Sequence, residues 1–270
     1  MSFETEGFLS EDLAHRFSNM PQCGKWFDLA FRLNRLGHKF AFTEKEFEIQ
    51  GGALSDVRAL TTMLSFRALS NFQGSILLAD RGLIVEARAL ARCMGESVLC
   101  MVGAKFDPEH WKALADDEIK SRKGRSRLLL RNAGWLDDAQ TEKLNSQLEL
   151  MKADWKALSG LDYSKIAQQG GCEIHYVIYR QLSADAGHAS LEALFRYITE
   201  EADGTIISLQ PAPKLTPEII SDTVGIACNF FFLAWAIVIE YFPDQTTADQ
   251  VGACWEEYKR LGGERKLAGA

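Results

Sequence analysis

The chain contains none of the motifs that mark the common nucleotide- and metal-dependent enzymes. It has no Gly-x-Gly-x-x-Gly, no P-loop and no His-Glu-x-x-His. No Gly-x-Ser-x-Gly elbow surrounds Ser183, so a hydrolase nucleophile is not predicted. Glu173, His175 and His188 form only a weak candidate for a metal site, since ligands normally come in tighter clusters. We therefore expect neither a metal nor a cofactor.

Proline and cysteine are scarce, with six of each in 270 residues. Each proline falls where a helix would begin or end, which is typical of a helical protein. No two cysteines form a Cys-x-x-Cys pair, so they are expected to be small buried side chains in a reducing compartment. The acidic segment 1–6 has no signal-peptide core. The expected location is the cytoplasm.

Positive charge is also in deficit, because the net charge is −7. An acidic protein is not attracted non-specifically to nucleic acid, although a local basic site is compatible with this charge. The most basic stretch is Lys120–Arg131, which follows Asp116, Asp117 and Glu118. It is either a solvated helix face with pairs along the helix or a phosphate-binding strip.

The hydrophobic periodicity predicts an all-α, multi-helix bundle with at most one small β-hairpin, near residues 194–209. A helix over 191–201 is the alternative for that segment. We expect a single domain over 1–270, with a helical extension at 1–52 and a core bundle at 54–261. The expected helices are 11–19, 22–41, 54–78, 82–104, 107–132 (with Asp107 as N-cap), 136–158, 173–186, one opened by Thr216 as N-cap, and 247–261.

An uncharged apolar run extends from Thr223 to Ile239 and includes Asn229. Its 17 residues fall short of the roughly 20 that a spanning helix needs. A helix that is apolar on all sides is either a membrane span or the central helix of a large core. The short length and the flanking Asp222 and Glu240 favour a core helix, and no membrane association is expected.

The helix predicted around residues 81–99 carries one charged stripe. Arg81, Arg88, Arg92 and Glu96 fall on one side of it by helical spacing. Val85 and Leu99 lie within the same stripe, whereas a solvated face would be more uniformly polar. We expect a partly buried Arg–Glu network between helices, because buried charges must be paired. Its role is either structural or that of a ligand or active site.

A second polar group is predicted on the helix that ends near Gly187. Tyr176, Tyr179, Arg180 and Ser183 share one face by three- and four-residue spacing, and His188 follows the end of the helix. The helix dipole there favours a protonated imidazole. These residues either tie the turn in place or supply an acid–base group with a cation and hydroxyls.

These two helices also carry a family resemblance. The run from Leu77 to Leu99, the segment Ala115–Lys123 and the run from Tyr179 to Ile198 resemble the bacterial domain-of-unknown-function family fifty-six seventy-seven. The resemblance spans about residues 60–242 and implies a helical fold without an assigned activity. A remoter similarity connects Arg180 and His188 with the HEPN helical ribonucleases, whose motif is Arg-x(4–6)-His. Here seven residues separate the two, which departs from that motif.

Two functional hypotheses follow from these patterns. In the first, Arg88, Arg92, Glu96, Tyr179 and Ser183 bind an anionic ligand or RNA, with His188 and Arg180 as catalytic residues of a HEPN-like, metal-independent ribonuclease. In the second, the protein is a non-catalytic homodimer or ligand-binding protein, and the polar residues hold the bundle together.

Overall fold

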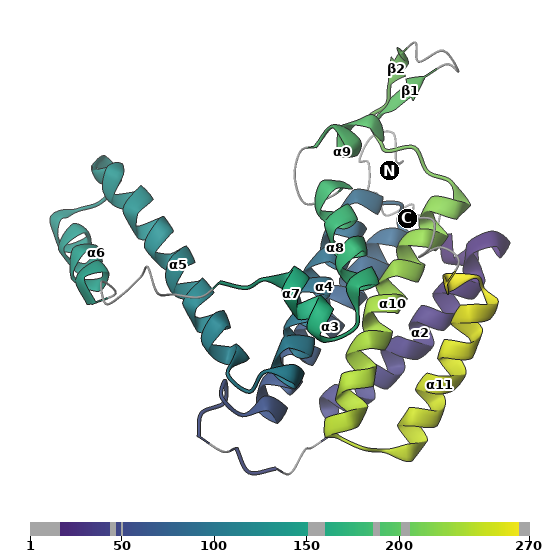
Figure 1. Cartoon of the computed structure of the whole chain (residues 1–270). Helices are drawn as coiled ribbons and strands as arrows, with labels where there is room; N and C mark the ends of the chain where they lie inside the picture. Colours follow the sequence, from purple (N-terminus) through teal and green to yellow (C-terminus); the bar gives the residue numbers. More distant parts are fainter. Residues whose placement is uncertain are drawn as a thin grey trace.

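The computed structural model describes residues 17–43, 47–49, 51–150, 160–185, 190–200 and 206–264. Within them the chain is all-α apart from one antiparallel hairpin, as the sequence predicts (Figure 1). The elements are η2 (Phe17–Asn19), α2 (Pro21–Phe42), α3 (Val57–Asp80), α4 (Ile84–Phe106), α5 (His110–Arg131), η3 (Ala133–Trp135), α6 (Asp138–Leu150), α7 (Tyr163–Gln169), α8 (Glu173–Asp185), α9 (Leu191–Phe195), β1 (Ile198–Glu200), β2 (Ile206–Leu209), α10 (Pro217–Tyr241) and α11 (Gln245–Arg260).

Side-chain caps fix several helix starts. Thr216 accepts from the amide of Ile219 at 3.3 Å, which confirms the predicted cap of α10. The predicted N-cap of α5, Asp107, was wrong, because the residue at that position is Glu109. Asp107 accepts from the amide of Glu109 at 2.9 Å, and this bond closes a turn ahead of the helix instead of capping its first residue.

The segment near 194–209 combines both predicted alternatives. A short helix, α9, comes first, and β1 then pairs with β2 in antiparallel register, with Ile198 opposite Leu209. The connection between the strands, residues 201–205, lies outside the described residues, as do residues 11–16, 151–158 and 186 of three predicted helices.

The core forms where α2, α3, α4 and α10 pack together (Figure 1). The rings of Phe72 on α3 and Phe231 on α10 stack with centroids 4.4 Å apart. Glycine permits the close approach of α4 to α10, because a Cβ at Gly95 would meet the Phe230 ring at 2.9 Å. The apolar face of α4 that packs in this core consists of fully buried side chains: Ile84, Ala87, Ala91, Met94 and Val98.

Helix α10 is long and apolar enough to span a membrane, but 72% of its most apolar window is buried inside the protein. That burial favours the prediction of a core helix. The six cysteines are free thiols, and all except Cys93 are buried, which agrees with their prediction as small core side chains.

Helix α5 extends away from this body, and α6 folds back alongside α5 (Figure 1). No described residue of α5 or α6 belongs to the hydrophobic core. We call α5 and α6 the arm. Its surface includes the exposed Trp135, in the turn that joins the two helices.

Candidate functional site

Two polar clusters lie where α4 packs against α8, and together we call them the arginine network. Helix α4 supplies Arg88, Arg92 and Glu96 at successive four-residue steps, which places them on one side of the helix. Each cluster joins one of these arginines to α8, and the two arginines are one helical turn apart. The network consists of Arg88, Arg92, Glu96, Tyr179, Ser183, Asp185, Arg196 and Thr223.

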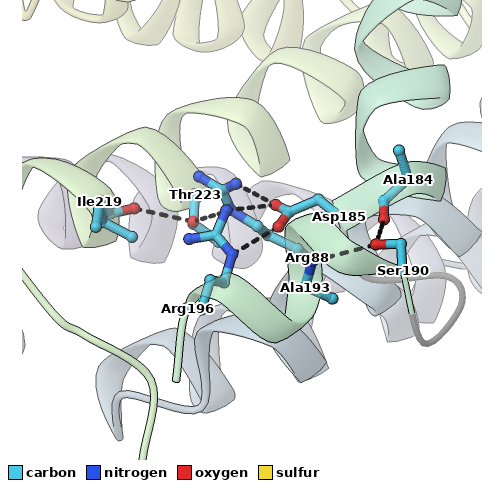
Figure 2. A network of polar contacts seen from close by, with 8 residues as sticks. All are labelled: Arg88, Ala184, Asp185, Ser190, Ala193, Arg196, Ile219 and Thr223. Carbon is cyan, nitrogen blue, oxygen red and sulfur yellow. Dashed lines mark hydrogen bonds and ion pairs between the residues drawn. The ribbon is translucent and has the colours of Figure 1, made fainter. Parts of the chain in front are cut away.

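The first cluster is centred on Asp185, the last residue of α8. Arg196 donates two parallel hydrogen bonds to this carboxylate, from Nε to Oδ1 at 2.6 Å and from a terminal nitrogen to Oδ2 at 2.7 Å. Arg88 forms a second ion pair with Oδ2 and donates from Nε to the Thr223 hydroxyl at 2.9 Å (Figure 2). Thr223 donates in turn to the carbonyl of Ile219 at 2.9 Å. The cluster thereby ties α4, α8 and α10 to the segment after α9.

Burial would make the Asp185 carboxylate costly if its charge were not balanced. Its side chain is 3% exposed, against 14% for Arg88 and 16% for Arg196. Burial alone raises the pKa of Asp185, but the bonds and charges of Arg196 and Arg88 outweigh that effect and hold the pKa below its ordinary value. The carboxylate is therefore ionised at neutral pH.

The second cluster surrounds Arg92. Its Nε donates to the Ser183 hydroxyl at 2.8 Å, and a terminal nitrogen donates to the Tyr179 hydroxyl at 3.3 Å and pairs with Glu96 at 3.0 Å. The Tyr179 hydroxyl donates in turn to Glu96 at 3.2 Å. The Cζ atom of Arg92 also lies over the Tyr179 ring, 5.3 Å from the ring centroid. The predicted Arg92–Glu96 pair is thus present, within a neutral cluster.

The two clusters differ in charge balance. Arg92 and Glu96 cancel, whereas Arg88 and Arg196 share the single carboxylate of Asp185. A guanidinium has five N–H donors, and the bonds described use two nitrogens of each arginine. Among the described residues, the network therefore has one positive charge in excess and guanidinium donors that these bonds do not use. Such a set can bind an anion.

The remaining predicted residues occupy other positions. Arg180 lies on the exposed face of α8, one residue beyond Tyr179, and no hydrogen bond or ion pair joins it to the network in the part of the chain described. Arg81, predicted in the charged stripe, is also exposed. His188 lies outside the described residues, three positions after Asp185 in the sequence.

The basic stretch of α5 shows pairing along the helix. Arg122 and Arg125 both pair with Glu118, at 3.4 and 3.3 Å, and all three side chains are more than half exposed. Lys123 and Ser126 in the same stretch are buried, but Glu118, Arg122 and Arg125 form the solvated face that one interpretation of Lys120–Arg131 expects. Its charges contribute little to stability, because water screens them.

Three members of the network were absent from the sequence prediction. Asp185 could have been found, since Ile178, Leu182 and Asp185 recur at four- and three-residue steps on the buried face of α8. Arg196 and Thr223 gave no such signal. They reach Asp185 and Arg88 through tertiary contacts that no local spacing reveals.

Comparison with known proteins yields one finding. A family model described as "Family of unknown function (DUF5677)" matches residues 58–206. No curated protein and no solved structure matches the chain. The matched range contains every residue of the arginine network except Thr223 on α10. Because it covers more than half of the 270 residues, the chain belongs to this family.

Proposed function

We propose that this member of the DUF5677 family binds a phosphate-bearing anionic ligand at the arginine network. The observation that carries the proposal is the charge balance there: among the described residues, three guanidinium groups face two carboxylates. The arginine side chains are 14–23% exposed, so their outer edges can reach a ligand from solvent.

Phosphate suits this arrangement better than other anions. The planar guanidinium matches two phosphate oxygens at once, and the bond is strengthened because both partners are charged. A positive charge kept largely away from water costs free energy unless an anion balances it. Since the whole chain carries a net charge of −7, it does not attract anions in general, and recognition of an anion depends on these local donors.

Arg92 gives the test of anion binding. We expect the wild type to bind inorganic pyrophosphate in isothermal titration calorimetry and Arg92→Gln to bind it about 10- to 100-fold more weakly, which corresponds to the loss of a charged hydrogen bond. Arg122→Gln is the matched control, because Arg122 also pairs with a glutamate four residues away but lies on the arm. Equal affinities in the wild type, Arg92→Gln and Arg196→Gln would refute the site, because Arg196 belongs to the cluster that carries the excess charge.

A second candidate function is metal-independent cleavage of RNA. It is supported by the position of the network at the end of α8, three residues before His188, and by the exposure of Arg180, which a polymeric substrate could reach. In this reaction the 2′-hydroxyl gives its proton to His188 and attacks phosphorus, the bond to the 5′-oxygen breaks, and that oxygen takes up a proton. Arg180, with Arg88 or Arg92, would balance the charge on the phosphate oxygens.

The cleavage hypothesis predicts a large effect of one imidazole. His188→Ala should cut a labelled single-stranded RNA at least about 100-fold more slowly than the wild type, and EDTA should leave both rates unchanged. His38→Ala, at an exposed position of α2, is the control and should retain the wild-type rate. Equal rates for His188→Ala and the wild type, or no cleavage of varied RNAs, would leave anion binding without catalysis.

A further inference from the structure

A pocket lies on another part of the molecule, between α10 and α11, with the start of α8 at one side. Its volume is about 420 Å³, within the range of small-molecule sites in proteins. None of the arginine network residues lines it. The pocket is therefore independent of the function proposed above.

The lining of this pocket is apolar and uncharged in the part described. Helix α10 contributes Phe232 and Leu233, and α11 contributes Val251 and Trp255. No Asp, Glu, Lys or Arg lies among the described lining residues. Such a surface favours an apolar and uncharged occupant, since a charged one would lose its hydration without a partner.

One polar atom in the lining, Oδ1 of Asn229, lacks a hydrogen-bond donor among the described residues. Asn229 stands in the middle of the apolar helix α10 and is only 2% exposed. Its side chain interacts with the Tyr258 hydroxyl, but its Oδ1 is buried and has no hydrogen-bond partner among the described residues. A buried acceptor without a donor is destabilising, and a bound donor would remove that cost.

His175 supplies a second polar group on the same pocket. Its Nδ1 is buried and finds no partner of ordinary hydrogen-bond geometry in the described structure. Burial lowers the pKa of His175 to about 4, against a smaller opposing effect of the Cys172 carbonyl. The imidazole is therefore neutral at pH 7, so this end of the pocket also lacks a charge that would attract an ion.

We infer that the pocket between α10 and α11 binds an uncharged, mainly apolar small molecule whose hydroxyl or amide N–H donates to Oδ1 of Asn229. The apolar walls give such a molecule its binding free energy, and the Asn229 acceptor gives it orientation. Neutral His175 can exchange a further hydrogen bond with the same polar group.

Gly252 offers a way to close the pocket without damaging the core. It lines the pocket from α11, and a Cβ added there meets no atom within 4 Å. A leucine at this position would fill part of the pocket. It would not disturb the helix, because leucine has a higher helix propensity than glycine. Gly124 is the matched control, since it also lies within a helix and faces open space.

The test compares 2-naphthol with naphthalene, which has the same rings without the hydroxyl, by saturation-transfer NMR and competition. We expect 2-naphthol to bind the wild type about tenfold more tightly, the worth of one hydrogen bond to a buried acceptor. Gly252→Leu should weaken 2-naphthol at least tenfold and Gly124→Leu should leave it unchanged. In Asn229→Leu, the preference for 2-naphthol should disappear.

Several results would overturn the inference. Equal affinity of the wild type for both compounds would remove the role of Asn229, and unchanged binding in Gly252→Leu would place the compounds elsewhere. If Gly252→Leu instead abolished a concentration-dependent dimer seen by light scattering, the pocket would belong to an interface between two copies. Because Gly252→Leu changes no core contact, the conclusion stands even if Asn229→Leu fails to fold.

Discussion

Asp185→Ala is expected to lower the free energy of unfolding by about 3–5 kcal/mol, because it leaves two largely buried guanidinium groups without their shared carboxylate. The bonds from Arg88 and Arg196 would be lost together, so α4, α8 and the segment after α9 would lose their common anchor (Figure 2). Urea denaturation of the two proteins measures the difference.

Glu256→Ala is the control for this effect. Glu256 also pairs with a cation, Lys259, but 64% of its side chain is exposed. Its loss should change stability by less than about 1 kcal/mol. An Asp185→Ala variant as stable as Glu256→Ala would show that the first cluster is not a structural anchor.

The same carboxylate should make stability depend on acidity. Because the folded-state pKa of Asp185 is below its ordinary value, its contribution is fully present above the unfolded pKa of about 4 and is lost as the pH falls through the folded pKa. The stability difference between the wild type and Asp185→Ala should therefore be constant from about pH 5 to 7 and shrink below about pH 4.

Phe72→Ala is expected to cost about 3–5 kcal/mol as well, through a cavity at the centre of the bundle. Phe72 is fully buried, and its ring stacks on Phe231 where α3 meets α10. Thermal unfolding followed by circular dichroism gives the loss. Leu77→Ala on the same helix is the control, since Leu77 is 63% exposed and should cost less than about 1 kcal/mol. Similar losses in both variants would contradict the packing described.

Local signals in the sequence were sufficient to predict much of the fold. Apolar spacing predicted α2, α4 and α10, and a cap residue fixed the start of α10 at Thr216. The short helix α7 was missed, because its seven residues show less than two turns of periodicity. Its cap, Asp162, accepts from the amide of Lys165 and was the available signal.

The candidate site was predicted only as far as single helices allow. Arg92 and Glu96 lie four residues apart on one helix, so their pairing followed from spacing alone. Arg196 meets Asp185 from beyond α9, and that contact depends on how the chain returns after α8. Spacing also grouped Arg180 with Tyr179, although neighbouring helical positions point about 100° apart and only Tyr179 is buried.

The arm has a mechanical consequence. A helix of 22 residues such as α5 is about 33 Å long, and no described residue of the arm is held in the core. A rotation of about 10° at Asp107, where the arm leaves the body, would therefore carry the far end of α5 through about 6 Å, a displacement set by the helical rise. A small change of angle at the base of the arm would therefore produce a large displacement at Trp135.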